Sequence, residues 1–388
     1  MNIVIAPDSF KGSISAKDLC SVLKRGITRI VPDARVVELP LADGGEGTME
    51  NLVYSSQGEI VQTTVSDPLG RPIAASYGII NGKTAVIEMA QASGLPLLKD
   101  EEKNPFITSS YGTGELIKNA LEGGYRDFII CLGGSATNDG GMGMLKALGI
   151  QFFDNQGRHL SEGGIALLKL ASYDYSGLDP RIAESSFTIA SDVINPLCGP
   201  QGASAVFGPQ KGATAEMVKE LDKALGQFAV VIFKQKRIDI RDLPGSGAAG
   251  GMGAALLAFL NARMQSGIEV VMDAINFREK VKSADLVITG EGRLDSQTLS
   301  GKVIAGVCKE AGKVAKPVIA LCGKLELSNQ QMETLGLKAG FSLVSGPCTL
   351  EDSMRKAEEF AEERIQSIIS LILLGAQNSF IKKIEVMG

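Results

Sequence analysis

The sequence has too few metal-binding side chains of the right kind for a structural zinc site. It contains one histidine, His159, in 388 residues, and none of its six cysteines belongs to a C-x-x-C pair. Structural zinc sites take four cysteine or histidine ligands, usually in closely spaced pairs. We therefore expect no zinc-binding domain.

Long runs of like charge and long apolar runs are also missing. The 39 basic and 44 acidic residues are mixed along the chain, which argues against a nucleic-acid surface and a polybasic membrane anchor. Polar residues interrupt the longest apolar stretch, residues 365–376, and no positively charged segment precedes the apolar residues 3–5. We expect no signal peptide, no membrane-spanning helix and a cytoplasmic protein with reduced thiols.

Glycine, in contrast, is abundant, and the 46 glycines gather with carboxylates and cations in short blocks. Glycine lets backbone N–H groups approach an anion closely, and carboxylates hold the Mg²⁺ that accompanies nucleotide phosphates. The pattern predicts a phosphoryl-transfer enzyme. The blocks are Asp8-Ser9-Phe10-Lys11-Gly12-Ser13, Asp43-Gly44-Gly45-Glu46-Gly47-Thr48, Gly133-Gly134-Ser135-Ala136-Thr137-Asn138-Asp139-Gly140-Gly141 and Gly290-Glu291-Gly292-Arg293-Leu294-Asp295.

The length of the chain and its strand and helix patterns predict two α/β domains. Residues 3–7 and 36–41 are predicted strands around a helix that begins near Ser15, and doubly wound character returns after residue 283. We predict a Rossmann- or flavodoxin-like parallel-sheet domain, residues 1–70 and 283–388, with an inserted α/β domain, residues 71–282. Because open parallel sheets bind ligands at the carboxyl ends of their strands, we expect the active site in the cleft between the domains.

Two segments resemble known nucleotide-binding motifs but do not meet all of their requirements. Gly82-Lys83-Thr84 has Tyr77 where a P-loop needs its first glycine. Residues 245–250 match the dinucleotide fingerprint G-x-G-x-x-G, but a charged, proline-ended stretch precedes them instead of a buried strand. We favour a glycine-rich entry that lets the helix predicted at 250–260 pack closely against a neighbour or a nucleotide.

The block at residues 133–141 follows a predicted strand at 128–132 and adds hydroxyl and amide side chains to its glycines. Its backbone amides, with Ser135 and Thr137, can cradle phosphate oxygens. The alternative is a tight turn whose polar side chains only cap a helix. We favour the cradle.

Carboxylates near the N-terminus suit metal and phosphate binding. Asp43 and Glu46 flank two glycines and can turn toward one site, where they would bind Mg²⁺ or substrate hydroxyls. The alternative for Glu46 is a favourable charge at the start of a helix. Asp8 and Lys11 form a similar pair, in which Lys11 would neutralise the transferred phosphoryl group or would simply be a solvated cation.

Two further groups combine acids with a hydrogen-bonding or cationic partner. Asp192 is placed to accept a proton from a substrate hydroxyl, and Asn195 to orient that hydroxyl. The alternative is that the two residues only form a turn. The second group, Glu291, Arg293 and Asp295, could bind a small carboxylate or a triphosphate, because arginine binds carboxylates with two parallel hydrogen bonds. The alternative is a surface ion-pair cluster.

In this order the blocks, which cover essentially the whole chain, resemble the signature sequences of the bacterial type I glycerate kinase family. The resemblance implies ATP-dependent phosphorylation of D-glycerate, on the 2-hydroxyl, and two α/β domains with one inserted in the other. The residues that carry it are Ala6-Pro7-Asp8-Ser9-Phe10-Lys11-Gly12, Pro40-Leu41-Ala42-Asp43-Gly44-Gly45-Glu46-Gly47-Thr48, residues 133–141, Asp192-Val193-Ile194-Asn195-Pro196-Leu197-Cys198-Gly199-Pro200 and Thr289-Gly290-Glu291-Gly292-Arg293-Leu294-Asp295.

The roles of individual residues are physical hypotheses. Asp192 or Asp43 would act as the base, Asp8 or Glu46 would bind Mg²⁺, and Arg293 would bind the carboxylate of glycerate. Lys11 and the block at 133–141 would contact the phosphates of ATP. The remaining candidates for substrate and phosphate binding are Ser9, Gly44, Gly45, Gly133, Gly134, Ser135, Thr137, Asn138, Asp139, Asn195, Glu291 and Asp295.

Other interpretations remain open at this point. The kinase could phosphorylate the 3-hydroxyl. Residues 245–250 could instead belong to an NAD-dependent hydroxy-acid oxidoreductase, and the chain could be a non-catalytic protein that binds a small acid. We expect a monomer or homodimer whose partners are small molecules.

Overall fold

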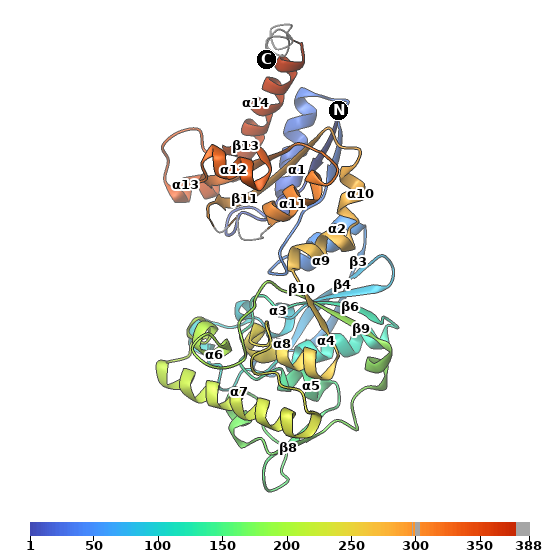
Figure 1. The fold of residues 1–388 in the computed structure, drawn as a ribbon, viewed down its shortest axis with the longest axis vertical. Coiled ribbons are helices and arrows are strands. Elements are labelled where there is room, and N and C mark those ends of the chain that lie inside the picture. The colour runs from blue at the N-terminus through green and yellow to red at the C-terminus, as the bar shows by residue number, and fades with distance from the viewer. Residues whose placement is uncertain (297, 299–302, 378–388) are drawn as a thin grey trace. The chain divides into compact units, whose positions relative to one another are not determined.

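The computed structural model describes residues 1–296, 298 and 303–377 (Figure 1). It divides the chain into two compact units. The terminal unit is formed by residues 1–42 and the described part of residues 272–388, and the central unit by residues 43–271.

Both domain boundaries lie away from the predicted positions. Residues 67–71 form the turn of a hairpin whose strands, β3 (Glu59–Ser66) and β4 (Pro72–Ile80), pair along their whole lengths. The proline and glycine residues near position 70 therefore mark a tight turn inside one unit and not a linker. At the second boundary, Arg278 in α10 (Phe277–Val281) pairs with Glu310 of α11 (Val303–Gly312) at 2.7 Å, which ties residues before 283 to the terminal unit.

The terminal unit is built on a five-stranded sheet in which every pairing is parallel. The predicted α/β class with a parallel sheet is thus confirmed. In spatial order the strands are β13 (Leu337–Ser342), β12 (Val318–Leu325), β11 (Leu286–Leu294), β1 (Asn2–Ile5) and β2 (Arg35–Glu38).

The first helix of this unit begins where the sequence predicts. Ser15 is the N-cap of α1 (Ala16–Ile30), and its hydroxyl accepts a hydrogen bond from the backbone N–H of Asp18 at 3.0 Å. Leu19, Leu23 and Ile27 lie one or two turns apart and are fully buried. The helix therefore packs its apolar face on the sheet, as its periodicity predicts. The other described helices of this unit are α10, α11, α12 (Asn329–Leu335), α13 (Leu350–Arg355) and α14 (Ala357–Gln377).

Helices α1 and α14, from opposite ends of the chain, pack closely together in the terminal unit (Figure 1). A Cβ atom at Gly26 would lie 2.5 Å from Cγ2 of Ile365 and 3.0 Å from the backbone oxygen of Glu362. Arg25 forms an ion pair with Glu362 at 2.7 Å beside this contact. The close approach of the two helices therefore requires glycine at position 26.

The central unit contains a six-stranded mixed sheet. Its strands in spatial order are β10 (Arg263–Gln265), β9 (Ser186–Ala190), β6 (Asp127–Cys131), β5 (Thr84–Glu88), β4 and β3. The first four are parallel, whereas β4 and β3 form the antiparallel edge. The carboxyl ends of four strands therefore lie at one edge, the position where parallel sheets bind ligands.

Helices and short connections complete the central unit around one large apolar core. They are α2 (Thr48–Ser56), α3 (Ala90–Ser93), α4 (Tyr111–Glu122), α5 (Met142–Ala147), α6 (Ala203–Phe207), α7 (Ala215–Lys236), α8 (Ala248–Phe259), α9 (Gly267–Ala274), which continues into the terminal unit, and the small hairpin of β7 (Gln151–Phe153) and β8 (Ser172–Asp174). Among the helices that the structure describes, none combines the length and apolarity needed to cross a membrane.

The packing of α1 on α14 gives a test with an internal control. Gly26→Ala should lower the free energy of unfolding by about 1–3 kcal/mol, because the added methyl group overpacks the contact with Ile365. Gly226→Ala, in the interior of α7 with no atom near the added Cβ, should raise it by about 0.5–1 kcal/mol through helix propensity alone. Urea denaturation measures both, and equal stability gains would contradict the close contact.

Candidate functional site

The loop after β2 crosses the carboxyl edge of the central sheet at van der Waals contact. A Cβ atom at Gly44 would lie 2.4 Å from the backbone oxygen of Ala190, the last residue of β9. A Cβ atom at Gly267, the first residue of α9, would lie 1.8 Å from the backbone oxygen of Asp43. Both positions must be glycine, and the contacts fix Asp43 at the ends of β9 and β10.

The same loop also contacts the turn that follows β6. A Cβ atom at Gly133 would lie 2.8 Å from Cα of Gly45. Two of the predicted glycine blocks, which are far apart in the sequence, thus meet backbone to backbone in the central unit. Glu46, in the middle of the first block, is exposed.

Asp192 lies in the next loop along this edge, directly after β9. Its Oδ1 accepts a hydrogen bond from the backbone N–H of Gly267 at 3.2 Å, and the Ser266 side chain also hydrogen-bonds to it. Desolvation raises the pKa of Asp192, and the charges of Asp43 and Glu269 raise it further, while the two hydrogen bonds lower it. The structure therefore brings the two proposed bases, Asp43 and Asp192, into one electrostatic site.

Asn195, predicted to orient a substrate hydroxyl, holds its own loop in place, and its role toward the substrate stays a prediction. Its side-chain N–H donates to the backbone oxygen of Gln201 at 2.8 Å, and its backbone oxygen accepts from Gly247 N–H at 3.0 Å. These contacts match the alternative interpretation of a structural turn.

Glu88 is a site residue that sequence reasoning missed. It ends β5, is only 4% exposed, and accepts a hydrogen bond from the backbone N–H of Met49 at 2.9 Å and another from that of Thr48. It therefore caps the N-terminus of α2, which directly follows the Asp43 loop. Burial raises the pKa of Glu88 to about 7. An acid at the end of an apolar strand, residues 84–88, was the available signal.

The block at 133–141 is tightly hydrogen-bonded within the central unit. The Asn138 side-chain N–H donates to Oγ of Ser204 at 3.0 Å, and Gly134, the turn residue, has φ 75° and is exposed. Ser135 Oγ and the Thr137 backbone oxygen each accept a hydrogen bond from Lys211. Lys211, in the segment Gly208-Pro209-Gln210-Lys211-Gly212, was also missed, because a sequence gives no reason to bury a lysine.

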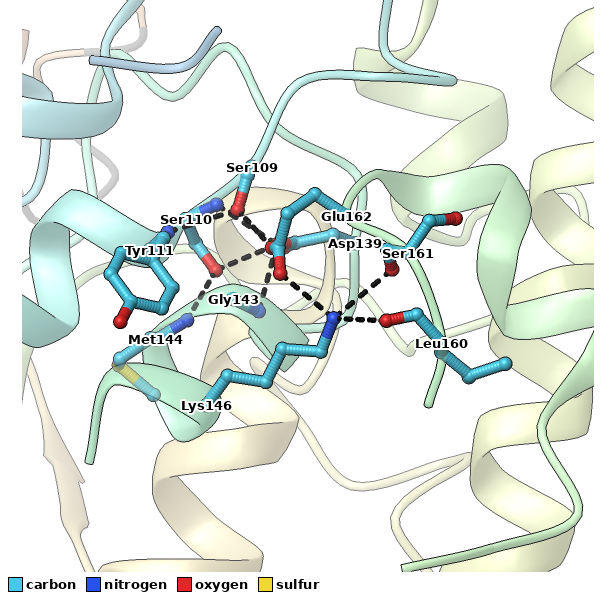
Figure 2. Close-up of polar contacts among 10 residues, drawn as sticks. All are labelled: Ser109, Ser110, Tyr111, Asp139, Gly143, Met144, Lys146, Leu160, Ser161 and Glu162. Atoms are coloured by element: carbon cyan, nitrogen blue, oxygen red, sulfur yellow. Dashed lines mark hydrogen bonds and ion pairs between the residues drawn. The ribbon is translucent and has the colours of Figure 1, made fainter. Parts of the chain in front are cut away.

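Asp139 does not face a ligand as the sequence suggested. Its carboxylate is fully buried and accepts hydrogen bonds from Ser110 Oγ at 2.7 Å and from the backbone N–H groups of Ser110, Gly141 and Gly143 at 2.9, 3.0 and 3.2 Å. Figure 2 shows its contacts with Ser110 and Gly143, together with Lys146 nearby. The side chain stabilises the turn into α5, because four donors satisfy a carboxylate that water cannot reach.

The glycine-rich segment at 245–251 packs on this block. A Cβ atom at Gly250 would lie 2.0 Å from the backbone oxygen of Thr137, and the Gly140 N–H donates to the Gly250 oxygen at 3.0 Å. In the described structure the element directly before the segment is the helix α7 and not a strand, so the context of a dinucleotide fingerprint is missing. The preferred interpretation, a glycine-rich entry for close helix packing, is confirmed.

The terminal unit has its own set of predicted residues at the carboxyl edge of its sheet. Asp8 N–H donates to the backbone oxygen of Gly290 at 2.8 Å, and the Asp8 carboxylate accepts from Ser9 N–H at 2.6 Å. This places the loop after β1 beside Glu291, which is buried and accepts a hydrogen bond from the Thr298 hydroxyl. Lys11 is exposed.

Arg293 lies in an exposed ion-pair cluster. Its guanidinium is 2.6 Å from the carboxylate of Glu326 and 3.2 Å from that of Asp295. The hydrogen bond to Glu326 and the charges of both acids raise the pKa of Arg293. The structure thus matches the alternative that the sequence left open, in which Arg293 belongs to a surface ion-pair cluster.

No ready-made metal cluster occurs in the described residues, in which no three His, Cys, Asp or Glu side chains are grouped to hold an ion. Asp8 belongs to the terminal unit and Glu46 to the central unit. Their assignment to Mg²⁺ stays a prediction.

Comparison with known proteins identifies the family. The model of the glycerate kinase family matches residues 3–373. The chain belongs to the glycerate kinase family. It is 47% identical to glycerate 2-kinase of Escherichia coli K12 over 98% of this chain and 100% of the relative, and 48% identical to glycerate kinase of Bacillus subtilis 168 over 96% and 98%.

A solved structure supports the same family. The crystal structure of a protein provisionally named glycerate kinase 2, from Salmonella typhimurium LT2, superposes with a TM-score of 0.88 at 48% identity, covering 97% of this chain and 100% of that one. The predicted family and α/β fold are therefore confirmed.

The buried Glu88 of this glycerate kinase family member gives a pH test. A carboxyl group whose folded pKa is raised from 4.5 to about 7 stabilises the fold fully below pH 4.5, and this contribution is lost as the pH rises through 7. Glu88→Gln keeps an acceptor for the Met49 and Thr48 N–H groups but cannot ionise. Relative to this variant, the wild type should lose about 1–3 kcal/mol of unfolding free energy between pH 4.5 and 8.

Denaturation of both proteins across this pH range measures the difference. Parallel curves for the wild type and Glu88→Gln would contradict the raised pKa. Glu101→Gln, at an exposed position of the same unit, serves as the control and should leave the pH dependence near that of the wild type.

Proposed function

We propose that this protein transfers the γ-phosphoryl group of ATP to the 2-hydroxyl of D-glycerate, giving 2-phospho-D-glycerate and ADP. Membership of the glycerate kinase family over nearly the whole chain supports a kinase that uses ATP and glycerate. The choice of the 2-hydroxyl rests on the name of the Escherichia coli relative, glycerate 2-kinase. The observation that carries the mechanism is the pairing of Asp192 with Asp43 at the carboxyl edge of the central sheet.

We assign the role of base to Asp192. The attacking hydroxyl must lose its proton as the phosphoryl group arrives, and a nearby carboxylate accepts it. Asp192 is exposed, and its raised pKa makes it a better proton acceptor than an ordinary aspartate. The Gly267 N–H and the Ser266 side chain hold one face of the carboxylate and fix its direction. Asp43 contributes the negative charge that favours proton uptake.

The ATP phosphates are proposed to bind the exposed turn at Gly133 and Gly134, with Ser135 and Thr137 behind it. Backbone N–H groups in glycine turns and hydroxyl groups bind phosphate oxygens in this way. Lys11 remains a candidate for the γ-phosphoryl group, with Ser9 beside it, and Arg293, near Glu291 and Asp295, for the glycerate carboxylate.

Mg²⁺ is expected to accompany ATP. Kinase sites hold this ion through one or two carboxylates together with phosphate oxygens and water, so they need no preformed cluster of protein ligands. Asp8 and Glu46 are carboxylates that fit this requirement, and bound Mg²⁺ would neutralise phosphate charge. The expected position of the active site between the two domains stays a prediction, as do the cytoplasmic location and the monomeric or homodimeric state.

Substitution of the two aspartates tests the base. Asp192→Asn should lower kcat by about two to four orders of magnitude, since asparagine cannot accept the proton, while Asp43→Asn should reduce kcat less. Asp127→Asn, at the opposite end of the same sheet, should keep wild-type turnover. If Asp43→Asn alone abolished turnover, the base would be Asp43, and normal turnover in both variants would exclude both.

The identity of the product tests the reaction itself. The purified protein is incubated with ATP, Mg²⁺ and D-glycerate, and phosphorus NMR identifies the product while ADP release is followed. We expect 2-phosphoglycerate. Formation of the 3-phosphate would keep the kinase but overturn the 2-hydroxyl, and ADP release that does not depend on glycerate would overturn the substrate.

A further inference from the structure

Lys211 is a lysine buried beneath the 133–141 block. Its side chain is 1% exposed, and its Nζ donates hydrogen bonds to Oγ of Ser135 and to the backbone oxygen of Thr137, both at 2.7 Å. A single ammonium thus joins two residues of the block that are separated by one position. Lys211 belongs to the short connection Pro209–Lys211, far from the block in the sequence.

These two hydrogen bonds leave some donors and acceptors around Lys211 without a partner. Three N–H donors are available on a charged lysine, and the described structure gives two of them to Ser135 and Thr137. In the same block, Oγ1 of Thr137 and Oδ1 of Asn138 are fully buried and have no hydrogen-bond partner among the described residues. Buried polar atoms in native proteins normally have partners, so these oxygens indicate a place where water or a ligand binds.

The charge of Lys211 is weakly compensated by the protein. Burial lowers its pKa to about 7, and Asp139 is the charged group whose field opposes this change in the described structure. The carboxylate of Asp139 is already held by Ser110, Gly141 and Gly143. A buried lysine without an ion pair in the described structure loses its proton easily, and it regains the positive charge when an anion binds nearby.

We propose that Lys211 is a positioning residue for ATP, whose ammonium fixes Ser135 and Thr137 in the conformation that receives the phosphates and places a positive charge behind them. This inference rests on the proposed function, in which the 133–141 block binds the phosphates. Lys211 acts through the block, so its loss should weaken nucleotide binding more than it alters glycerate binding.

Proton uptake follows from the same arrangement. Near pH 8 the ammonium of the free protein is largely deprotonated, because its pKa is about 7. A bound polyphosphate raises the pKa of a nearby cation, since opposite charges favour the charged form. Binding of MgATP at pH 8 should therefore be accompanied by net proton uptake, a property that a lysine with a purely structural role would not confer.

The experiment compares the wild type with Lys211→Met and Lys211→Gln. In both variants the KM for ATP should rise by about 10- to 100-fold, while the KM for glycerate stays within about twofold. Titration calorimetry with MgATP and no glycerate, in HEPES and in Tris at pH 8, should show proton uptake in the wild type and none in the variants. Thermal melts check that each variant is folded.

Lys146→Met is the matched control. Lys146 is a largely buried lysine of the same unit that also donates to backbone oxygens, those of Leu160 and Ser161, and pairs with Glu162 (Figure 2). Its hydrogen bonds in the described structure go to Leu160, Ser161 and Glu162 and not to Ser135 or Thr137, so the KM for ATP should stay within about twofold of the wild-type value.

The possible results separate the two proposals. An unchanged KM for ATP in a folded Lys211→Met protein, or a rise confined to the KM for glycerate, overturns the role of Lys211 while the kinase reaction stands. If neither Lys211 variant folds, proton uptake by the wild type decides: uptake supports the proposal and its absence overturns it. A wild-type protein that binds MgATP with proton uptake but does not phosphorylate glycerate would overturn the proposed function alone.

Discussion

The candidate site of the central unit depends on backbone contacts that leave no room for a side chain. The loop after β2 reaches the end of β9 because residue 44 has no Cβ, and α9 starts against the same loop because residue 267 has none. A side chain at either position would overlap backbone atoms, so the loop would have to move away from the sheet. Such a movement would change the placement of Asp43, whose charge raises the pKa of Asp192. The glycine content of the chain is thus a condition for the chemistry and not only for the turns.

Ionisable groups buried next to the site hold its loops. Glu88 accepts hydrogen bonds from the first turn of α2, and Asp139 accepts hydrogen bonds from the turn that leads into α5. Lys211 donates hydrogen bonds to two residues of the 133–141 block. Each would be costly to bury without hydrogen bonds, and each forms them with backbone groups or uncharged side chains instead of with an opposite charge. Loops held in this way keep a fixed shape while leaving their outer surface to substrates, which suits a kinase that works mainly by positioning.

The two units contribute different kinds of groups to the proposed reaction. The central unit holds Asp43, Asp192 and the glycine turns at strand ends, a set suited to proton transfer and phosphate binding. The terminal unit holds Asp8 and Lys11 at the carboxyl edge of a parallel sheet, where such sheets bind ligands. Membership of the glycerate kinase family supports ATP and glycerate as the substrates of the protein.

Much of this could be predicted from the sequence, because local patterns determine local structure. Helical spacing and the Ser15 cap predicted α1, strand-end acids pointed to Asp43 and Asp192, and the motifs identified the family. Only the tertiary structure decided which polar residues face inward. In the structure Asp139 is buried, Arg293 pairs with Glu326, and Lys211 lies under the 133–141 block. The sequence could not predict these contacts, because they join segments that are far apart in the chain. Periodicity and composition indicate the secondary structure that a segment favours, whereas the burial of a side chain depends on its neighbours in space.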